Sequence, residues 1–318
     1  MRILKLLCLL LVAGAVHAQP YPNRPVKIVV PYAPGGLPDT IARIVGAKLG
    51  DALGQQMVVE NKGGAGGITG VTDVAKAPAD GYTLLVADVG QIAINPHIFS
   101  KLPYDPMKDL APLSLVGTSP LYFVAHPSVQ ANNMKELAAL AKSQPGKLNY
   151  GSSGIGSIHH LATEALKSGL GIDLVHVPYK GTGQSVPALL GGQVALLYSA
   201  LPSIEGHVKS GKVKLLAVST ARRMPQTPDV PTVAESGVPG YEFVAEIGML
   251  APAGTPREVI GRLAAEIAKA VKLPDVAQRF GQLGIEPVGN TPEQYGAINK
   301  AAHEKYGQLV KASGAKID

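Results

Sequence analysis

The sequence predicts an α/β fold with two lobes, each a mainly parallel sheet flanked by helices, and a cleft between the lobes. The first observation behind this is that short apolar runs repeatedly lead through glycine-rich turns into amphipathic helical stretches. Such strand–turn–helix units build parallel sheets. The second is that two apolar runs at 113–116 and 121–125 interrupt the series, which starts again near residue 148. A renewed series indicates a second sheet.

The first unit occupies residues 26–49. Residues 27–30 form a β-branched apolar run, and prolines and glycines up to Gly36 end it. Pro38 falls in the first helical turn, where its missing N–H costs nothing, and apolar residues then recur at helical spacing up to Leu49. The glycines permit a tight turn that leaves the N–H groups of the helix start facing outward. Ligands of open α/β sheets lie at this level, so we expect an anion site here.

Two further units complete the expected first sheet. A strand at 56–60 leads through the glycine-rich turn 61–67 into a helical stretch at 68–76. A third strand at 82–87 ends in residues 88–91. Three strands joined by helical crossovers imply one parallel sheet.

The second lobe is expected after a crossing at 117–120. Its first strand leads into a glycine and serine turn at 151–157 and an amphipathic helix, and its second strand leads into a turn at 180–185. The expected strands are 148–150, 174–179, 194–198 and 214–218.

The chain is then expected to return to the first lobe. An extended apolar run at 241–250 precedes two amphipathic helices, and these need a sheet face to cover. We therefore expect lobe 1 to comprise residues 19–119 and 245–318, and lobe 2 to comprise residues 120–244. Two connecting strands would form a hinge beside a cleft.

Residues 1–18 have the features of a cleaved signal peptide: a basic start, an apolar run and small side chains before the cleavage position. The apolar run is far shorter than a membrane span of roughly 20 residues. Cys8 is the only cysteine and lies too early for a lipid anchor, so no disulfide is expected in the mature chain. Removing Arg2 and Lys5 lowers the formal charge from +6 to +4 (6 − 2), which suits an anionic small molecule.

Several functional classes lack their marks. Basic residues are scattered and aromatic residues are few, which argues against nucleic-acid binding. No complete dinucleotide or phosphate-loop motif occurs. His160 and Glu164 stand four residues apart on an expected helix, but no further ligand cluster accompanies them, so no metal site is expected. A secreted α/β hydrolase using Ser152 or Ser153 remains an alternative without the usual nucleophile motif, and a histidine within hydrogen-bond reach of either hydroxyl would favour it.

Seven segments together resemble one family, the extracytoplasmic solute receptors of the tripartite tricarboxylate transporter system, also called Bug receptors. They follow one another in order along essentially the whole mature chain. The segments are VPYAPGGLPDTIARIV, VENKGGAGGITG, VAKAPADGYTLLVAD, INPHIF, LNYGSSGIGSIHHLATEAL, VPYKGTGQSVPALLGGQ and MLAPAGTP.

The resemblance implies a two-lobe periplasmic-binding-protein fold in the periplasm, without catalysis, cofactor or metal. It also implies that the protein captures a small organic carboxylate and delivers it to a two-subunit inner-membrane permease. For Asp39 and Lys180, a helix cap and a solvated side chain are the alternatives to ligand contact. The ligand-binding residues implied by position are Tyr32, Gly35, Gly36, Leu37, Asp39, Asp88, Gln91, Ser152, Ser153, Gly156, Ser157, Lys180 and Thr182, and Glu246 is a further candidate at a position that departs from the family.

One position departs from the family pattern. Many members carry aromatic residues just before the last segment, where this chain has Glu246 and Ile247. A Glu246 side chain facing the cleft would pair with a cationic or hydroxyl-bearing group, or disfavour a second carboxylate by like-charge repulsion. The alternative is a surface carboxylate near the hinge. A ligand-sensing module for a membrane signalling partner also remains open, because it would share the same cleft.

Overall fold

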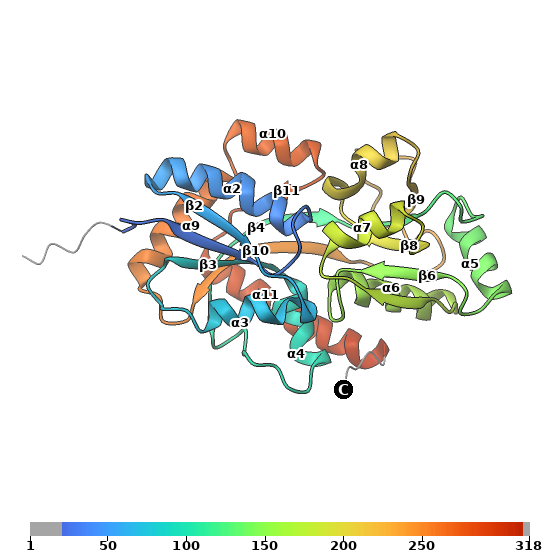
Figure 1. The fold of residues 1–318 in the computed structure, drawn as a ribbon, viewed down its shortest axis with the longest axis horizontal. Coiled ribbons are helices and arrows are strands. Elements are labelled where there is room, and N and C mark those ends of the chain that lie inside the picture. Colours follow the sequence, from blue (N-terminus) through green and yellow to red (C-terminus); the bar gives the residue numbers. More distant parts are fainter. Residues whose placement is uncertain (1–20, 314–318) are drawn as a thin grey trace, which may run out of the picture.

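The computed structural model describes residues 21–313, which form two α/β lobes (Figure 1). The expected signal peptide, residues 1–18, lies outside the described residues. The first sheet has the strand order β11-β4-β10-β3-β1-β2 and the second β7-β6-β8-β5-β9. The first contains β1 (Val26–Val30), β2 (Met57–Asn61), β3 (Thr83–Asp88), β4 (Leu110–Pro120), β10 (Val244–Pro252) and β11 (Glu286–Pro287). The second contains β5 (Tyr122–Ala125), β6 (Asn149–Ser152), β7 (Val175–Pro178), β8 (Leu196–Ser199) and β9 (Lys214–Val218).

The two-lobe α/β fold is confirmed, but the sheets are mixed rather than mainly parallel. As expected, β1 pairs in parallel with β2 and β3, and β6 with β7 and β8. By contrast, β10 is antiparallel to both β3 and β4, and β5 is antiparallel to both β8 and β9. The reason is that β4 carries the chain out of the first sheet and β10 carries it back, so these two long strands run in opposite directions.

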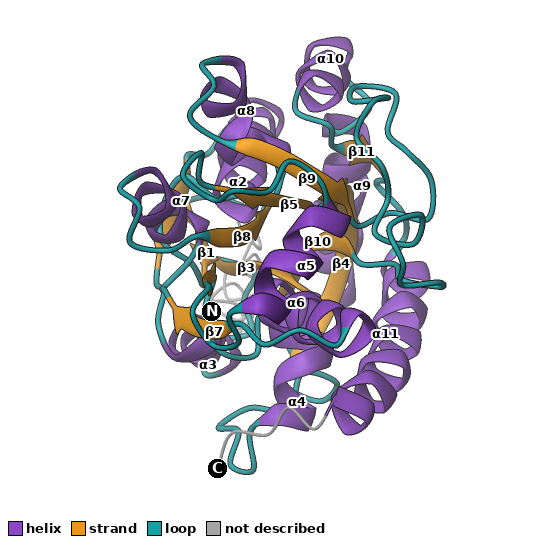
Figure 2. Cartoon of the chain, turned by 90° about the vertical axis from the view of Figure 1, so that its right-hand side faces the viewer, coloured by secondary structure: helices purple, strands orange, loops and turns teal. Residues whose placement is uncertain are grey.

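Helices surround the strands of both lobes (Figure 2). The sequence pattern did not indicate α5 or α10. Within residues 21–313 no helix combines the length and the apolar character that crossing a bilayer would require. The helices are α2 (Leu37–Leu53), η2 (Ala65–Gly67), α3 (Ile68–Ala75), η3 (Gly90–Ile94), α4 (Asn95–Ile98), α5 (Met134–Ser143), α6 (Ile158–Leu170), α7 (Thr182–Leu190), α8 (Leu201–Lys209), α9 (Arg257–Ala270), α10 (Pro274–Gln282) and α11 (Pro292–Ser313).

Two chain crossings join the sheets, and a buried serine holds them together. Only Leu121 separates β4 from β5, and the return runs from the end of β9 through Phe243 into β10. The Ser219 backbone N–H donates to the Leu121 carbonyl oxygen over 2.8 Å, and the Ser219 carbonyl oxygen accepts from the Phe243 N–H over 3.0 Å. The Ser219 hydroxyl also donates to the Phe243 carbonyl. We keep 119/120 and 244/245 as the proposed limits of the lobes, beside this paired hinge.

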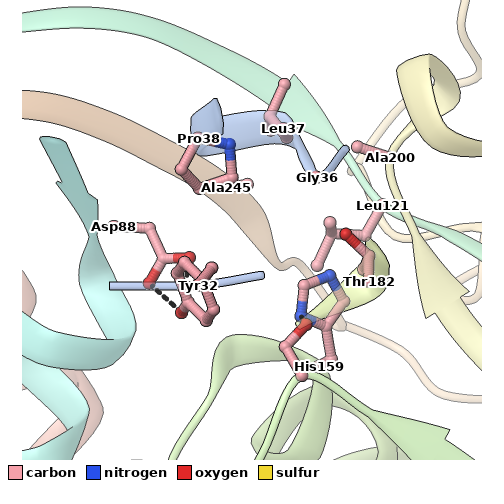
Figure 3. A pocket seen from close by; sticks show the side chains of 11 residues that line it. Tyr32, Gly36, Leu37, Pro38, Asp88, Leu121, His159, Thr182, Ala200 and Ala245 are labelled. Carbon is pink, nitrogen blue, oxygen red and sulfur yellow. Dashed lines mark hydrogen bonds between the residues drawn. The ribbon is translucent and has the colours of Figure 1, made fainter. Parts of the chain in front are cut away.

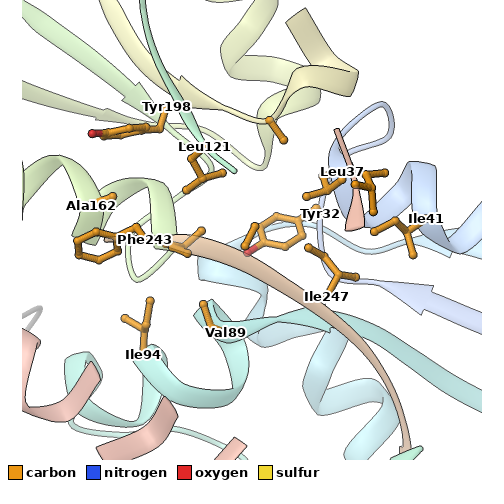
Figure 4. Close-up of a cluster of buried hydrophobic side chains, with 14 of the residues drawn as sticks. Tyr32, Leu37, Ile41, Val89, Ile94, Leu121, Ala162, Tyr198, Phe243 and Ile247 are labelled. Carbon is orange, nitrogen blue, oxygen red and sulfur yellow. The ribbon is translucent and has the colours of Figure 1, made fainter. Parts of the chain in front are cut away.

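One apolar cluster extends from lobe 1 through the hinge into lobe 2 (Figure 4). Tyr32 and Ile41 belong to its lobe 1 part, Leu121 and Phe243 to its hinge part, and Tyr198 to its lobe 2 part. All five are buried. Because burial of apolar surface favours the contact between the lobes, this arrangement stabilises a closed conformation.

Candidate functional site

A cavity lies between the lobes, and in this closed conformation its free space is about that of one water molecule (Figure 3). It is narrow, and a water-sized sphere fits in only a small part of it. Lobe 1 contributes Tyr32, Gly36, Leu37, Pro38, Asp88 and Ala245 to its lining. The hinge and lobe 2 contribute Leu121, Ser153, His159, Thr182 and Ala200.

Four helices begin at this cavity. Gly36 is the N-cap of α2, Thr182 is the first residue of α7 and Ala200 is the N-cap of α8, while His159 lies in the first turn of α6. The first N–H groups of a helix lack intrahelical partners and carry about half a positive charge. Four such ends around one cavity create a site that favours negative charge, although no lysine or arginine is among the lining residues of the described chain.

The turn after β1 has a local reason for its shape. Gly35 has a φ of 86°, in the left-handed region that glycine adopts without strain. Its N–H donates to the Asp39 carboxylate over 2.9 Å, and Arg43 and Asn61 donate to the same carboxylate. Burial acts to raise the pKa of Asp39, but these hydrogen bonds outweigh it and the pKa is lowered. Asp39 therefore fixes the turn that precedes α2 and does not line the cavity.

Asp88, at the end of β3, is the only charged side chain on the lining within the described residues. Its carboxylate accepts from the Tyr32 hydroxyl over 2.9 and 3.0 Å and from the Gly90 N–H over 2.7 Å. Gln91 donates to the Tyr32 hydroxyl over 2.7 Å and so orients it. Burial raises the pKa of Asp88 to about 6, although the bonds from Gly90 and Tyr32 act to lower it.

Ser153 and His159 form the polar pair on the lobe 2 side. The Ser153 Oγ lies 2.8 Å from Nδ1 of His159, and both side chains are buried. Burial lowers the pKa of His159 to about 4, so this ring is neutral at neutral pH. The neutral imidazole and the hydroxyl hold one donatable proton each, and their mutual hydrogen bond uses one of the two. The pair can therefore donate one hydrogen bond to an anion without adding charge.

The remaining lobe 2 residues expected to bind ligand are not among the lining residues of the cavity. Ser152 bonds its own turn and lies with Oγ 2.6 Å from Nε2 of His176. Ser157 is the N-cap of α6 and accepts from the His160 N–H. Gly156 packs against Asn95 of lobe 1, where a Cβ would collide. The Lys180 side chain is exposed, and its carbonyl oxygen instead accepts from the Ala33 N–H.

Glu246 does not face the cavity. Successive residues of a strand point to opposite faces, and its neighbour Ala245 lines the cavity. The Glu246 side chain is therefore on the α11 side of β10, where Lys305 partly offsets the rise in its pKa caused by burial. The Glu246 carboxylate therefore does not pair with a ligand in the cavity.

Six of the expected positions line the cavity: Tyr32, Gly36, Leu37, Asp88, Ser153 and Thr182. The sequence interpretation missed five lining residues: Pro38, Leu121, His159, Ala200 and Ala245. His159 carried a usable signal, because it follows the glycine and serine turn at the start of an expected helix. Leu121 and Ala245 also carried a usable signal, because both lie beside the expected crossings between the lobes.

The hydrolase alternative can be judged from the same contacts. Both Ser152 and Ser153 have a histidine within reach, so the expected discriminator by itself is met. Within residues 21–313, however, neither His176 nor His159 hydrogen-bonds a carboxylate that would orient it as a base. Burial lowers the pKa values of these rings to about 3 and about 4, which makes them weak bases. The geometry lacks a catalytic triad.

Two α/β lobes closed over a cavity at a two-stranded hinge define the class of periplasmic binding proteins. Comparison with known proteins gives the family: its model, described as the tripartite tricarboxylate transporter family receptor, matches residues 41–315. The protein BugT of Bordetella pertussis is 37% identical over 309 residues, covering 96% of this chain and 94% of BugT. The chain belongs to this receptor family, and its family is one of solute-binding proteins rather than enzymes.

Solved structures support the same assignment. The periplasmic binding protein BugD has a TM-score of 0.90 and 38% identity, covering 93% of this chain and 99% of BugD. MatC from Rhodopseudomonas palustris, solved with bound malate, has a TM-score of 0.87 and 33% identity, covering 91% of this chain and all of MatC (100%). The family resemblance seen in the sequence is thereby confirmed, and with it the periplasmic location of this class of receptor.

Proposed function

We propose that this protein binds a small organic carboxylate in the cavity between its lobes and delivers it to a two-subunit inner-membrane permease. The observation that carries the proposal is the convergence of the α2, α6, α7 and α8 N-termini on one cavity. The malate in MatC, a structural neighbour over most of the chain, supports a carboxylate as the ligand.

The energetics are sufficient without a cationic side chain. Each helix N-terminus contributes about 0.3–2 kcal/mol to anion binding, and each hydrogen bond to a charged group about 1.5–3 kcal/mol. A dissociation constant of about 1 μM requires about 8 kcal/mol. A few such contacts around one carboxylate reach that value, so recognition by backbone amides and hydroxyls such as those of Ser153 and Thr182 is adequate.

The test is a thermal-unfolding screen of the purified protein, refolded to remove any bound ligand, against mono-, di- and tricarboxylates. A ligand at 100 times its Kd should add about 2.7 kcal/mol to the free energy of unfolding. The matched controls are the methyl esters of the same acids, which keep the shape and remove the charge. Stabilisation by acids and not by esters supports the proposal. Equal effects of both, or no response to any acid, would contradict it.

Delivery to the permease is tested with the acid that the screen identifies. Uptake of the labelled acid should fall to background when either permease subunit or this receptor is deleted. Uptake that persists without the permease would contradict that part of the proposal. We also propose that residues 1–18 are a signal peptide, and N-terminal sequencing of the periplasmic protein should begin at Gln19.

A further inference from the structure

Asp88 stands out on the cavity lining because nothing in the anion-binding role requires it. It is 3% exposed and lies with Tyr32 on one side of the cavity, while His159 and Thr182 lie on the other (Figure 3). A buried carboxylate without a cationic partner is costly. Within the described residues, no lysine or arginine lines the cavity to offset it.

The hydrogen bonds of Asp88 leave acceptor capacity unused. Its two oxygens share one Tyr32 hydroxyl proton, and Oδ1 also accepts from the Gly90 N–H. An ionised carboxylate has about four acceptor positions. The Tyr32 hydroxyl accepts from Gln91, which fixes its proton on Asp88, so this set of donors is held in place. The free positions can take a donor from a bound ligand.

We propose that Asp88 binds a protonated amine, and that the ligand of this receptor is therefore a zwitterionic amino acid rather than a plain di- or tricarboxylate. This rests on the proposed function, because the ligand carboxylate would lie at the helix N-termini. The amine would lie at Asp88. The two sides of the cavity thus match the two charges of one molecule.

A second ligand carboxylate fits this arrangement poorly. Two like charges facing each other in a buried cavity repel, and no cation among the lining residues compensates. A cationic amine instead neutralises the buried charge and forms a charge-assisted hydrogen bond, which is about twice as strong as a neutral one. Discrimination between the two ligand classes therefore depends on the charge of Asp88.

The charge of Asp88 also sets a pH dependence. The groups around it are tyrosines of several elements, Tyr32, Tyr104, Tyr295 and Tyr306, whose pKa values burial raises far above neutrality. Across the cavity, burial lowers the pKa of His159 to about 4. Between pH 5 and pH 8, Asp88 is thus the lining group that titrates, with a pKa of about 6. Amino acids should bind more tightly as pH rises through 6, and dicarboxylates more weakly.

The experiment is calorimetric titration with chain-matched pairs: 4-aminobutanoate against succinate, 5-aminopentanoate against glutarate, and the α-amino acids. Each is measured at pH 5 and pH 7. We expect the best amino acid to bind at least about tenfold more tightly than its dicarboxylate at pH 7. The reason is that a hydrogen bond to a charged group is stronger than a neutral one by an amount that corresponds to about tenfold in Kd. Its affinity should rise about tenfold from pH 5 to pH 7, as the ionised fraction of a group with a pKa of about 6 does.

Two variants locate the effect. Asp88→Asn keeps the shape and an acceptor for Gly90 but removes the charge, and should lose the preference for amino acids at both pH values. Glu246→Gln removes a carboxylate that lies on the other face of β10 and does not line the cavity, and it should retain the preference. If Asp88→Asn does not fold, the pH dependence of amino-acid and dicarboxylate binding by the wild type still tests the inference. Dicarboxylates that bind more tightly than every amino acid at pH 7, or an unchanged preference in Asp88→Asn, would overturn the inference. Failure of all acids to bind would instead reject the proposed function itself.

Discussion

The backbone N–H of Ala33 donates to the carbonyl oxygen of Lys180 over 2.9 Å, which joins the turn after β1 to the turn before α7 across the gap between the lobes. The Ser203 hydroxyl makes a second such bond, to the Gly35 carbonyl oxygen over 3.1 Å. Because both bonds connect elements of different lobes, they can exist only when the lobes are closed. The conformation is therefore the closed one, and in it the backbone of the turn after β1 contacts the backbone of the turn before α7.

A Gly183→Ala substitution should weaken ligand binding without touching the cavity. A Cβ at Gly183 would collide with the Pro34 carbonyl oxygen of the other lobe. Closure would then be hindered, and a tenfold lower population of the closed state raises the apparent Kd about tenfold. Calorimetric titration measures this, and small-angle scattering should show a larger radius of gyration with ligand than in the wild type.

The matched control for Gly183→Ala is Gly206→Ala. Gly206 is an exposed residue of α8, and a Cβ there would meet no atom within 4 Å. Both changes raise helix propensity, by roughly 0.5–1 kcal/mol. Only the change at Gly183 should affect the Kd. Wild-type affinity in Gly183→Ala would show that the contact with Pro34 does not govern closure.

Ser153→Ala should reduce affinity for the carboxylate. The Ser153 hydroxyl is a hydrogen-bonding group on the lining and is held 2.8 Å from His159. Loss of one hydrogen bond costs about 1 kcal/mol, or roughly a fivefold rise in Kd. Ser143→Ala serves as the control, because its exposed hydroxyl bonds only the local Leu140 carbonyl. An unchanged Kd in Ser153→Ala would exclude a direct ligand contact at this hydroxyl.

Acid should destabilise the protein in part through His159. Burial holds the pKa of His159 at about 4, below its usual 6.5, so the unfolded chain binds more protons between these values. The stability that this group contributes is complete above pH 6.5 and is lost as pH falls to about 4. The raised pKa of Asp88 has the opposite sign, but it is common to wild type and variant.

The His159→Asn variant tests this, because asparagine keeps a polar atom toward Ser153 and does not titrate. Urea unfolding at pH 7 and pH 4 should show a smaller acid loss in the variant than in the wild type, by as much as about 3 kcal/mol. The absence of a bound ligand must be checked in both proteins. Identical losses on acidification would show that His159 does not stay neutral in the folded state.

Lys180→Ala should leave carboxylate affinity within about twofold of the wild type, because exposed charges are screened by water and salt. The side chain is exposed and absent from the lining, whereas the closure bond uses only the Lys180 backbone carbonyl. Titration at low and high salt provides the measurement. A loss of tenfold or more at low salt would show that the lysine reaches the ligand and that the site needs a cation.

The sequence alone indicated the local elements well, because they depend on neighbouring residues. The β1 run, the turn at Gly35 and Gly36, and the start of α2 all follow from apolar periodicity and turn chemistry within about ten positions. The family motifs extended this to the whole chain. The same reasoning offered a helix cap as the alternative role of Asp39, whereas Gly36 is the N-cap and the Asp39 carboxylate accepts from the Gly35 N–H in the turn before it.

Only the tertiary structure decided which side chains share the cavity. Side chains along β10 alternate between the two faces of the strand. Whether Ala245 or Glu246 faces the cavity depends on which face α11 covers, and α11 lies about 50 residues later in the chain. Likewise His159 and Asp88 are 71 positions apart in the sequence (159 − 88) and line the same cavity only because the lobes close about the hinge. Such contacts arise from burial summed over both lobes, and no local pattern of residues encodes them.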